Sequence, residues 1–250
     1  MKKEAIIYNS HEATARDLQR KKYGHTDLLH ISGALKKGQL RISPTALNRV
    51  CEQYDKLTLL TPLSTGDELQ QGNHVIREAF LLELFTYYAD KNACKLTIKR
   101  QASIKQVKDT KKSVTSVQAW QEASDVHPDE LAASYFRFLP LFTKKLIRVR
   151  NLEEQIEFQL AFLRLPLLTL RREKHHDDAC FSSYVISGGL LTNRKQRTLG
   201  RLWFMRSNQK EGMVYTAITH YKPSLPWWMY RFTQATLHKM VMWQFKRYRS

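Results

Sequence analysis

The chain has 250 residues and carries 41 Lys and Arg against 23 Asp and Glu, a formal net charge of +18. A hydrophobic content of 42% and an aromatic content of 11% exclude an intrinsically disordered chain and allow one large domain or two smaller ones. No apolar run reaches the roughly 18 residues that a membrane-spanning helix needs. Three widely spaced cysteines, Cys51, Cys94 and Cys180, exclude a disulfide framework and predict a reducing, cytoplasmic location.

Residues 1–92 alternate between short apolar runs and helical patterns, which predicts a small α/β region. Ser43 and Pro44 suit the N-cap and the first turn of a helix. The predicted strands cover 5–8, 27–31 and 57–60, and the predicted helices cover 10–22, 44–54 and 74–89.

The middle of the chain is polar and basic. Residues 99–125 contain no Gly or Pro, and their lysines and arginines outnumber their acidic residues. A solvated helix fits this composition, but we favour a basic polar linker or excursion over residues 93–130. A break at Pro128 then precedes a second domain, residues 131–250.

From Tyr135 onward the apolar residues recur at a period of two, which is typical of half-buried antiparallel strands. The predicted strands cover 147–149, 156–162, 167–170, 181–186, 202–205 and 213–221. A helix with a broad apolar arc and no acidic residue follows from Pro226 to Arg249. We therefore predict an α+β fold, with a curved antiparallel sheet wrapped on a long C-terminal helix after the small α/β region.

Two stretches of this second domain resemble a known group of proteins. GRLWFM (200–205) and VYTAITHYKPSLPWWMYRFTQATLHKMVMWQF (214–245) are similar in the order of their elements to the end of the START-like, or Bet v 1-like, helix-grip superfamily. That superfamily includes polyketide cyclases and hosts binders and enzymes alike. The resemblance implies that a late strand, a Pro-containing loop and a long helix close one side of a hydrophobic cavity.

The candidate ligand-binding residues follow from this arrangement. They are the sheet residues that would face the helix, the helix residues that would face the sheet, and two arginines that flank the strand 202–205. Arg201 and Arg206 suit a carboxylate or phosphate head group. The apolar positions are Trp203, Met205, Tyr215 and Ala217 on the sheet and Tyr230, Leu237, Met240 and Val241 on the helix.

Motifs for catalysis, metals and cofactors are weak. The run His175–Asp178 holds potential metal ligands, but adjacent side chains rarely face one ion, and an exposed turn is favoured. Ser182 and Ser183 lack a G-x-S-x-G elbow, and no P-loop or G-x-G-x-x-G spacing occurs. His220 and His238 favour structural roles. We predict no metal and no cofactor, and whether the protein is an enzyme stays open.

Three functional hypotheses remain. The first is a protein that binds an apolar or anionic small molecule or lipid between the sheet and the C-terminal helix. The second is a nucleic-acid-associated protein, because residues 131–250 hold 21 basic and 7 acidic residues and would attract a polyanion such as nucleic acid or an anionic membrane surface. The third is a small-molecule enzyme of the cyclase or hydrolase kind.

Overall fold

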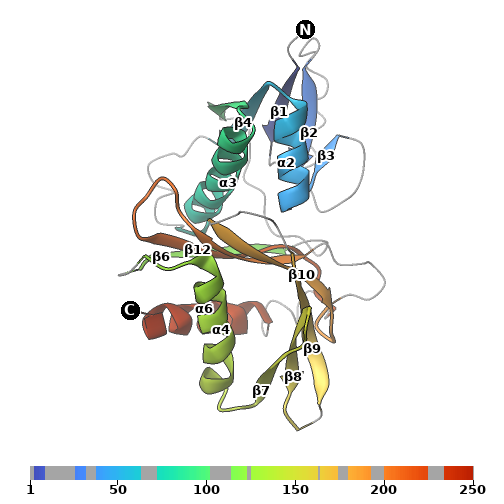
Figure 1. Cartoon of the computed structure of the whole chain (residues 1–250), viewed down its shortest axis with the longest axis vertical. Coiled ribbons are helices and arrows are strands. Elements are labelled where there is room, and N and C mark those ends of the chain that lie inside the picture. Colours follow the sequence, from blue (N-terminus) through green and yellow to red (C-terminus); the bar gives the residue numbers. More distant parts are fainter. Residues whose placement is uncertain are drawn as a thin grey trace. The chain divides into compact units, whose positions relative to one another are not determined.

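The structure, a computed structural model, describes residues 3–8, 26–31, 38–62, 72–101, 114–122, 125–162, 164–173, 180–192, 200–224 and 234–249. The chain divides into two compact units, Met1–Asp109 and Thr110–Ser250 (Figure 1). Each unit has its own sheet, and every described pair of neighbouring strands is parallel in the first and antiparallel in the second.

The first unit is built on a five-stranded sheet of order β3-β2-β1-β4-β5. The strands are β1 (Glu4–Tyr8), β2 (Asp27–Ile31), β3 (Gln39–Leu40), β4 (Lys56–Pro62) and β5 (Lys95–Gln101), and the described helices are α2 (Pro44–Gln53) and α3 (Gly72–Lys91). Ile7 and Leu57 are fully buried in neighbouring central strands, as expected where helices cover a parallel sheet. The helices α2 and α3 pack on each other, and Ser43 Oγ caps α2 by accepting the Ala46 N–H at 3.2 Å.

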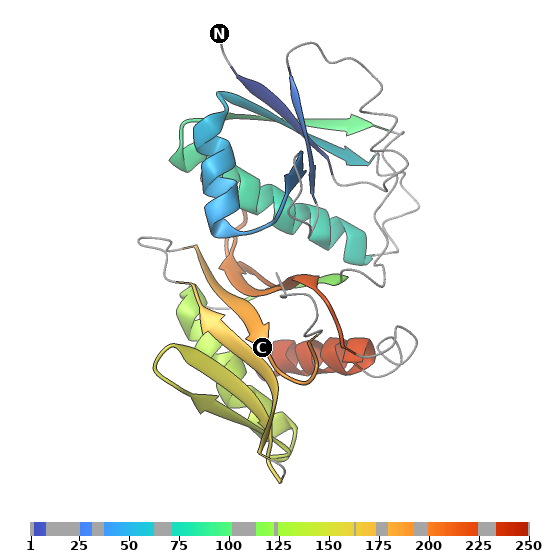
Figure 2. The ribbon, with the colours of Figure 1, turned by 90° about the vertical axis from the view of Figure 1, so that its right-hand side faces the viewer.

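The second unit is built on a seven-stranded sheet of order β6-β12-β11-β10-β9-β8-β7. The strands are β6 (Val114–Gln121), β7 (Ile147–Asn151), β8 (Gln155–Leu160), β9 (Leu165–Arg172), β10 (Phe181–Gly188), β11 (Arg201–Arg206) and β12 (Met213–Tyr221). Strands β7 to β12 form a continuous meander, and β6 returns to pair with β12. Figure 2 shows the meander from a second side.

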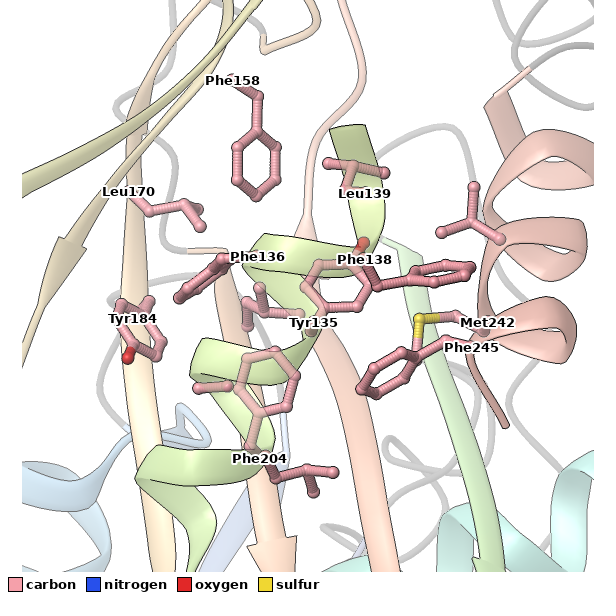
Figure 3. Packing of buried hydrophobic residues seen from close by; sticks show 14 of the residues in the cluster. Tyr135, Phe136, Phe138, Leu139, Phe158, Leu170, Tyr184, Phe204, Met242 and Phe245 are labelled. Carbon is pink, nitrogen blue, oxygen red and sulfur yellow. The ribbon is translucent and has the colours of Figure 1, made fainter. Parts of the chain in front are cut away.

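Two of the described helices contribute to the core of this unit together with the strands, α4 (Pro128–Phe142) and α6 (Gln234–Arg249). The helix α4 packs against β7, β10, β11 and α6. Tyr135 and Phe136 of α4 both contact Phe204 of β11, and Phe245 of α6 contacts Tyr135 with ring centroids 5.3 Å apart. These rings join the strands and both helices into one buried cluster (Figure 3).

The predicted fold class is wrong. The protein is mostly β, with one parallel and one antiparallel sheet, and the seven-stranded sheet is not wrapped on a long C-terminal helix. The described part of α6 has 16 residues, and α4, which was not predicted, packs across the strands. Tyr135, Phe136 and Phe138 are aromatic residues of high strand propensity, yet they lie in a helix because that helix covers the sheet.

The range 93–130 holds two strands. It contains β5, which pairs with β4, and β6, which pairs with β12, while residues 102–113 lie outside the described part. The predicted helix 10–22 and the start of the predicted C-terminal helix, residues 226–233, also lie outside it.

Candidate ligand-binding site

The two faces of the seven-stranded sheet have different neighbours. Side chains alternate between the faces along a strand. Leu202 and Phe204 of β11 lie on the face that α4 and α6 cover, since Phe204 contacts Tyr135. Arg201, Trp203 and Met205 consequently lie on the opposite face.

Most of the sequence-predicted site residues on the sheet lie together on that opposite face. Trp203 pairs directly with Ala217 and Met205 with Tyr215 across β11 and β12, so the four side chains share one face. All four are buried. The structure therefore groups these four residues, but on the face away from α6.

A buried polar network accompanies them. Arg201 forms two hydrogen bonds with Glu173, at 2.8 and 2.9 Å, and Ser183 Oγ donates to the same carboxylate at 3.0 Å. Trp203 Nε1 donates to Thr219 Oγ1 at 2.9 Å. Because the Arg201 side chain is only 8% exposed and its charge is paired, this geometry suits a structural ion pair better than an open head-group site.

The remaining predicted residues are spread over several places. Arg206 lies on the helix-covered face and pairs with Asp125. Val241 lies on the buried side of α6. Its neighbour Met240 is 46% exposed and lines a surface groove with Trp120 and Trp243. The side chain of Leu237 and the whole of Tyr230 lie outside the described residues.

An apolar pocket of about 150 Å³ lies on the helix-covered face of the sheet. Strands from the whole width of the sheet line it on one side, with Tyr135 and Leu139 of α4 and Val241 of α6 on the other. The strand and loop residues are Val114, Ser116, Ile147, Phe158, Leu167, Leu168, Ile186, Leu191, Leu202, Ile218 and Tyr221.

Three side chains that line this pocket carry a hydroxyl group: Ser116, Tyr135 and Tyr221. The two tyrosines differ in their hydrogen bonds. Tyr221 donates its hydroxyl to the Leu191 carbonyl oxygen. The hydroxyl of Tyr135 has no hydrogen-bond partner among the described residues, and burial raises the pKa of Tyr135. Tyr135 thus contributes a neutral hydroxyl to a lining that is mostly apolar.

A larger and more polar groove, of about 1000 Å³, lies between α4 and strands β7–β9. Phe136, Val149 and Ile156 supply apolar lining, and charged side chains of both signs line it as well. Within this groove, Arg172 bonds Asp129 at 2.5 Å. Basic and acidic groups are nearly balanced here, so the groove does not select an anionic ligand by charge.

Other sequence features do not form a site in the described part of the chain. The run His175–Asp178 lies outside it, and no cluster of three potential metal ligands occurs within it. The segments that follow the carboxyl ends of β1, β2, β4 and β5, where parallel sheets bind ligands, also lie outside it. None of the described helices has the length and apolar character needed to cross a bilayer.

The pocket residues of α4 were not predicted from the sequence. Tyr135 and Leu139 are four residues apart, and with Ala132 they form a helical apolar stripe that could have been recognised. Pro140 and three closely spaced aromatic residues obscured it. Pro140 lies in the last turn of the helix, where its missing N–H leaves the Phe136 carbonyl oxygen without its intrahelical bond, and the helix ends two residues later at Phe142.

Comparisons with known proteins leave the family open. No protein family matches the chain, and no curated protein matches it. An uncharacterised protein from Bacillus thuringiensis is similar with a TM-score of 0.28 and 7% identity, over 45% of this chain and 82% of that one. CapF bound to the inhibitor 3-isopropenyl-tropolone is similar with a TM-score of 0.19 and 10% identity, over 87% of this chain and 92% of that one. Likenesses this weak carry no argument, and the resemblance to the START-like superfamily stays a prediction.

Proposed function

We propose that the protein binds a small apolar molecule in the pocket formed by α4, α6 and the seven-stranded sheet. The observation that carries the proposal is an apolar space of about 150 Å³ within the buried cluster. The pocket is lined mainly by apolar side chains, and an apolar cavity of similar volume can hold a single aromatic ring. The ligand would be of that size, smaller than a lipid.

The Tyr135 hydroxyl adds a chemical preference. It is a neutral donor and acceptor without a partner among the described residues. A buried polar group gains most from a ligand that completes its hydrogen bond. We therefore expect a ring with one hydroxyl to bind more tightly than the same ring without it. The mostly apolar lining also favours a neutral ligand over an anion, because a charge would lose its hydration there.

Calorimetric titration of the full chain with p-cresol and toluene tests whether a small aromatic molecule binds and whether a hydroxyl on the ring strengthens binding. We expect both compounds to bind and p-cresol to bind more tightly. The variant Tyr135→Phe should keep toluene binding and lose the preference for p-cresol. Failure of both compounds to bind would contradict the proposal, and an unchanged preference in Tyr135→Phe would contradict the role of the hydroxyl.

A variant that fills the pocket tests whether the ligand binds there or at another surface. Val241→Phe places a ring into the space and should abolish binding while leaving the melting temperature nearly unchanged, since the space is open. Met240→Phe is the matched control, because Met240 is its neighbour in α6 but is 46% exposed. Loss of binding in the control but not in Val241→Phe would place the site elsewhere.

The cytoplasmic location is part of the same proposal. It is supported by Cys51, Cys94 and Cys180, which are all free thiols. The hypotheses of a nucleic-acid-associated protein and of a cyclase- or hydrolase-like enzyme stay predictions, as does a polyanionic partner.

A further inference from the structure

Four large apolar side chains are exposed at one end of the second unit. Leu141 is 63% exposed, Leu146 51%, Phe162 68% and Leu165 41%. They come from the last turn of α4, the α4–β7 connection, the β8–β9 turn and the start of β9. We call these four residues the apolar tip. The ends of the elements that carry it lie at the bottom of the second unit in Figure 1.

Backbone contacts hold the segments of the apolar tip together. The Ala161 N–H donates to the Leu146 carbonyl oxygen at 2.9 Å, and Leu160 pairs with Leu165 across β8 and β9. Thr143 Oγ1 accepts the Ile147 N–H at 3.1 Å, which ties the end of α4 to the start of β7. Hydrogen bonds therefore fix the segments that carry the apolar tip relative to one another.

The backbone of the two turns is also specialised. Lys144, Lys145 and Arg164 have φ angles of 48°, 65° and 50°. Residues with a Cβ pay an energetic penalty in this left-handed region, and glycine would adopt it more easily. The chain instead places a basic residue at each of these positions. All three side chains are exposed, and they stand directly before Leu146 and Leu165 in the chain, so they place positive charge beside the apolar tip.

The charge around the tip has one sign. Residues 141–150 and 158–172 contain no Asp or Glu, and Arg148 adds a further exposed positive charge. An apolar surface rimmed by basic residues matches the interface of an anionic bilayer, where apolar side chains enter the acyl boundary and Lys and Arg meet the head groups. A symmetric contact with a second copy would instead bring these like charges together.

We propose that the apolar tip binds the surface of anionic lipid membranes peripherally. Leu141, Leu146, Phe162 and Leu165 enter the head-group boundary, and Lys144, Lys145 and Arg164 pair with anionic lipids. This function does not involve the apolar pocket and goes beyond the binding of a small molecule. A nucleic acid would use the positive charges but would leave the four apolar side chains exposed.

Vesicle sedimentation of the full chain tests the proposal. We expect binding to vesicles of phosphatidylcholine with 30% phosphatidylserine, at least tenfold weaker binding to pure phosphatidylcholine, and weakening as salt rises. The double variant Leu141→Ser and Phe162→Ser should bind the anionic vesicles at least tenfold more weakly. Leu152→Ser is the matched control, because Leu152 is 42% exposed at the opposite end of β7.

A charge variant and two further measurements complete the test. Lys144→Glu should weaken vesicle binding more than Lys210→Glu, which reverses an exposed charge in the β11–β12 turn. Melting temperatures should stay unchanged, because all the substituted side chains are exposed. Absence of parent binding at low salt, or equal binding by the double variant, would overturn the proposal. The proposal would also be overturned if the double variant still bound vesicles but no longer formed a concentration-dependent dimer. The same holds if it still bound vesicles but no longer bound a DNA duplex.

Discussion

Arg201 and Glu173 show how a single pair of residues can determine stability. Their side chains are 8% and 15% exposed, and Ser183 donates to the same carboxylate. Burying a charge costs free energy that only its partner and its hydrogen bonds offset. The complete pair offsets the cost of its own burial, and removal of one member loses that compensation.

We expect Arg201→Met to lower the free energy of unfolding by about 3–5 kcal/mol, because the buried Glu173 carboxylate loses the guanidinium that bonds it. The double variant Arg201→Met and Glu173→Leu should recover much of this loss. Urea denaturation of the two single variants and the double variant measures the coupling. Additive losses would show that the two side chains act independently.

The three thiols are expected to differ in reactivity. Burial, with Cys94 nearby, raises the pKa of the Cys51 thiol to about 12, and burial also raises that of Cys94. Because the thiolate is the reactive form, a disulfide reagent at pH 8 should modify only the partly exposed Cys180 in the native protein. Three thiols should react in denaturant. Release of more than one equivalent from the native chain would contradict this.

The same pKa shift predicts a direction for stability. The neutral Cys51 thiol is favoured in the folded state, and an unfolded thiol ionises near its ordinary value of 9.0. The contribution of Cys51 is therefore full below about pH 9 and is lost as the pH rises toward 12. The variant Cys51→Ala should show a smaller decline in stability between these values.

At the residue scale, alternation predicted which sheet residues share a face but not which face they occupy. Trp203, Met205, Tyr215 and Ala217 lie together, as their spacing requires. The alternate residues of β11, Leu202 and Phe204, point to the other face of the sheet and are also apolar and buried. In a strand that is buried on both faces, neither set of alternating residues is polar. Its sequence therefore cannot indicate which face the helices cover.

Single elements were more predictable than their packing. The strands near 5–8, 27–31 and 57–60 and the helix near 44–54 are confirmed as β1, β2, β4 and α2. The meander strands were recognisable because their patterns are short, alternating and separated by turn residues. The helix α4 was missed because its aromatic residues favour strands locally, and only the sheet beneath it makes the helix favourable.

The role of α6 can be tested through one residue. Phe245 is fully buried and contacts Trp120, Tyr135 and Phe138, so it joins α6 to both β6 and α4. Arg249 adds an ion pair with Glu122 at 2.7 Å. We expect Phe245→Ala to lower the free energy of unfolding by about 3–5 kcal/mol through the cavity that it leaves.

Trp243→Ala is the control for this experiment. Trp243 is 52% exposed and has Arg247 over its ring at 4.9 Å, so its removal should cost about 1 kcal/mol or less. Chemical denaturation of both variants under the same conditions gives the comparison. Equal losses would show that α6 contributes through surface contacts, contrary to the buried position of Phe245.

At the scale of the whole molecule, positive charge is concentrated in residues 131–250, which make up most of the second unit. Residues 131–250 hold 21 basic and 7 acidic residues, a net charge of +14, whereas residues 1–130 hold 20 and 16, a net charge of +4. Composition gave this asymmetry directly. The pairing of β6 with β12 could not be predicted, because it joins strands nearly a hundred residues apart and no local pattern encodes such a contact.

The net charge predicts salt-dependent retention of the full chain on heparin, because binding to a polyanion releases counterions. Reversing one lysine changes the formal charge from +18 to +16 wherever that lysine lies. If retention depends on the field of the whole molecule, Lys144→Glu and Lys210→Glu should elute at salt concentrations that are lowered slightly and equally. The same two variants should differ in binding to anionic vesicles, where the position of Lys144 beside the apolar tip matters. A larger shift on heparin for Lys144→Glu would instead mean that the tip itself recognises polyanions and that the charge of the rest of the chain contributes little.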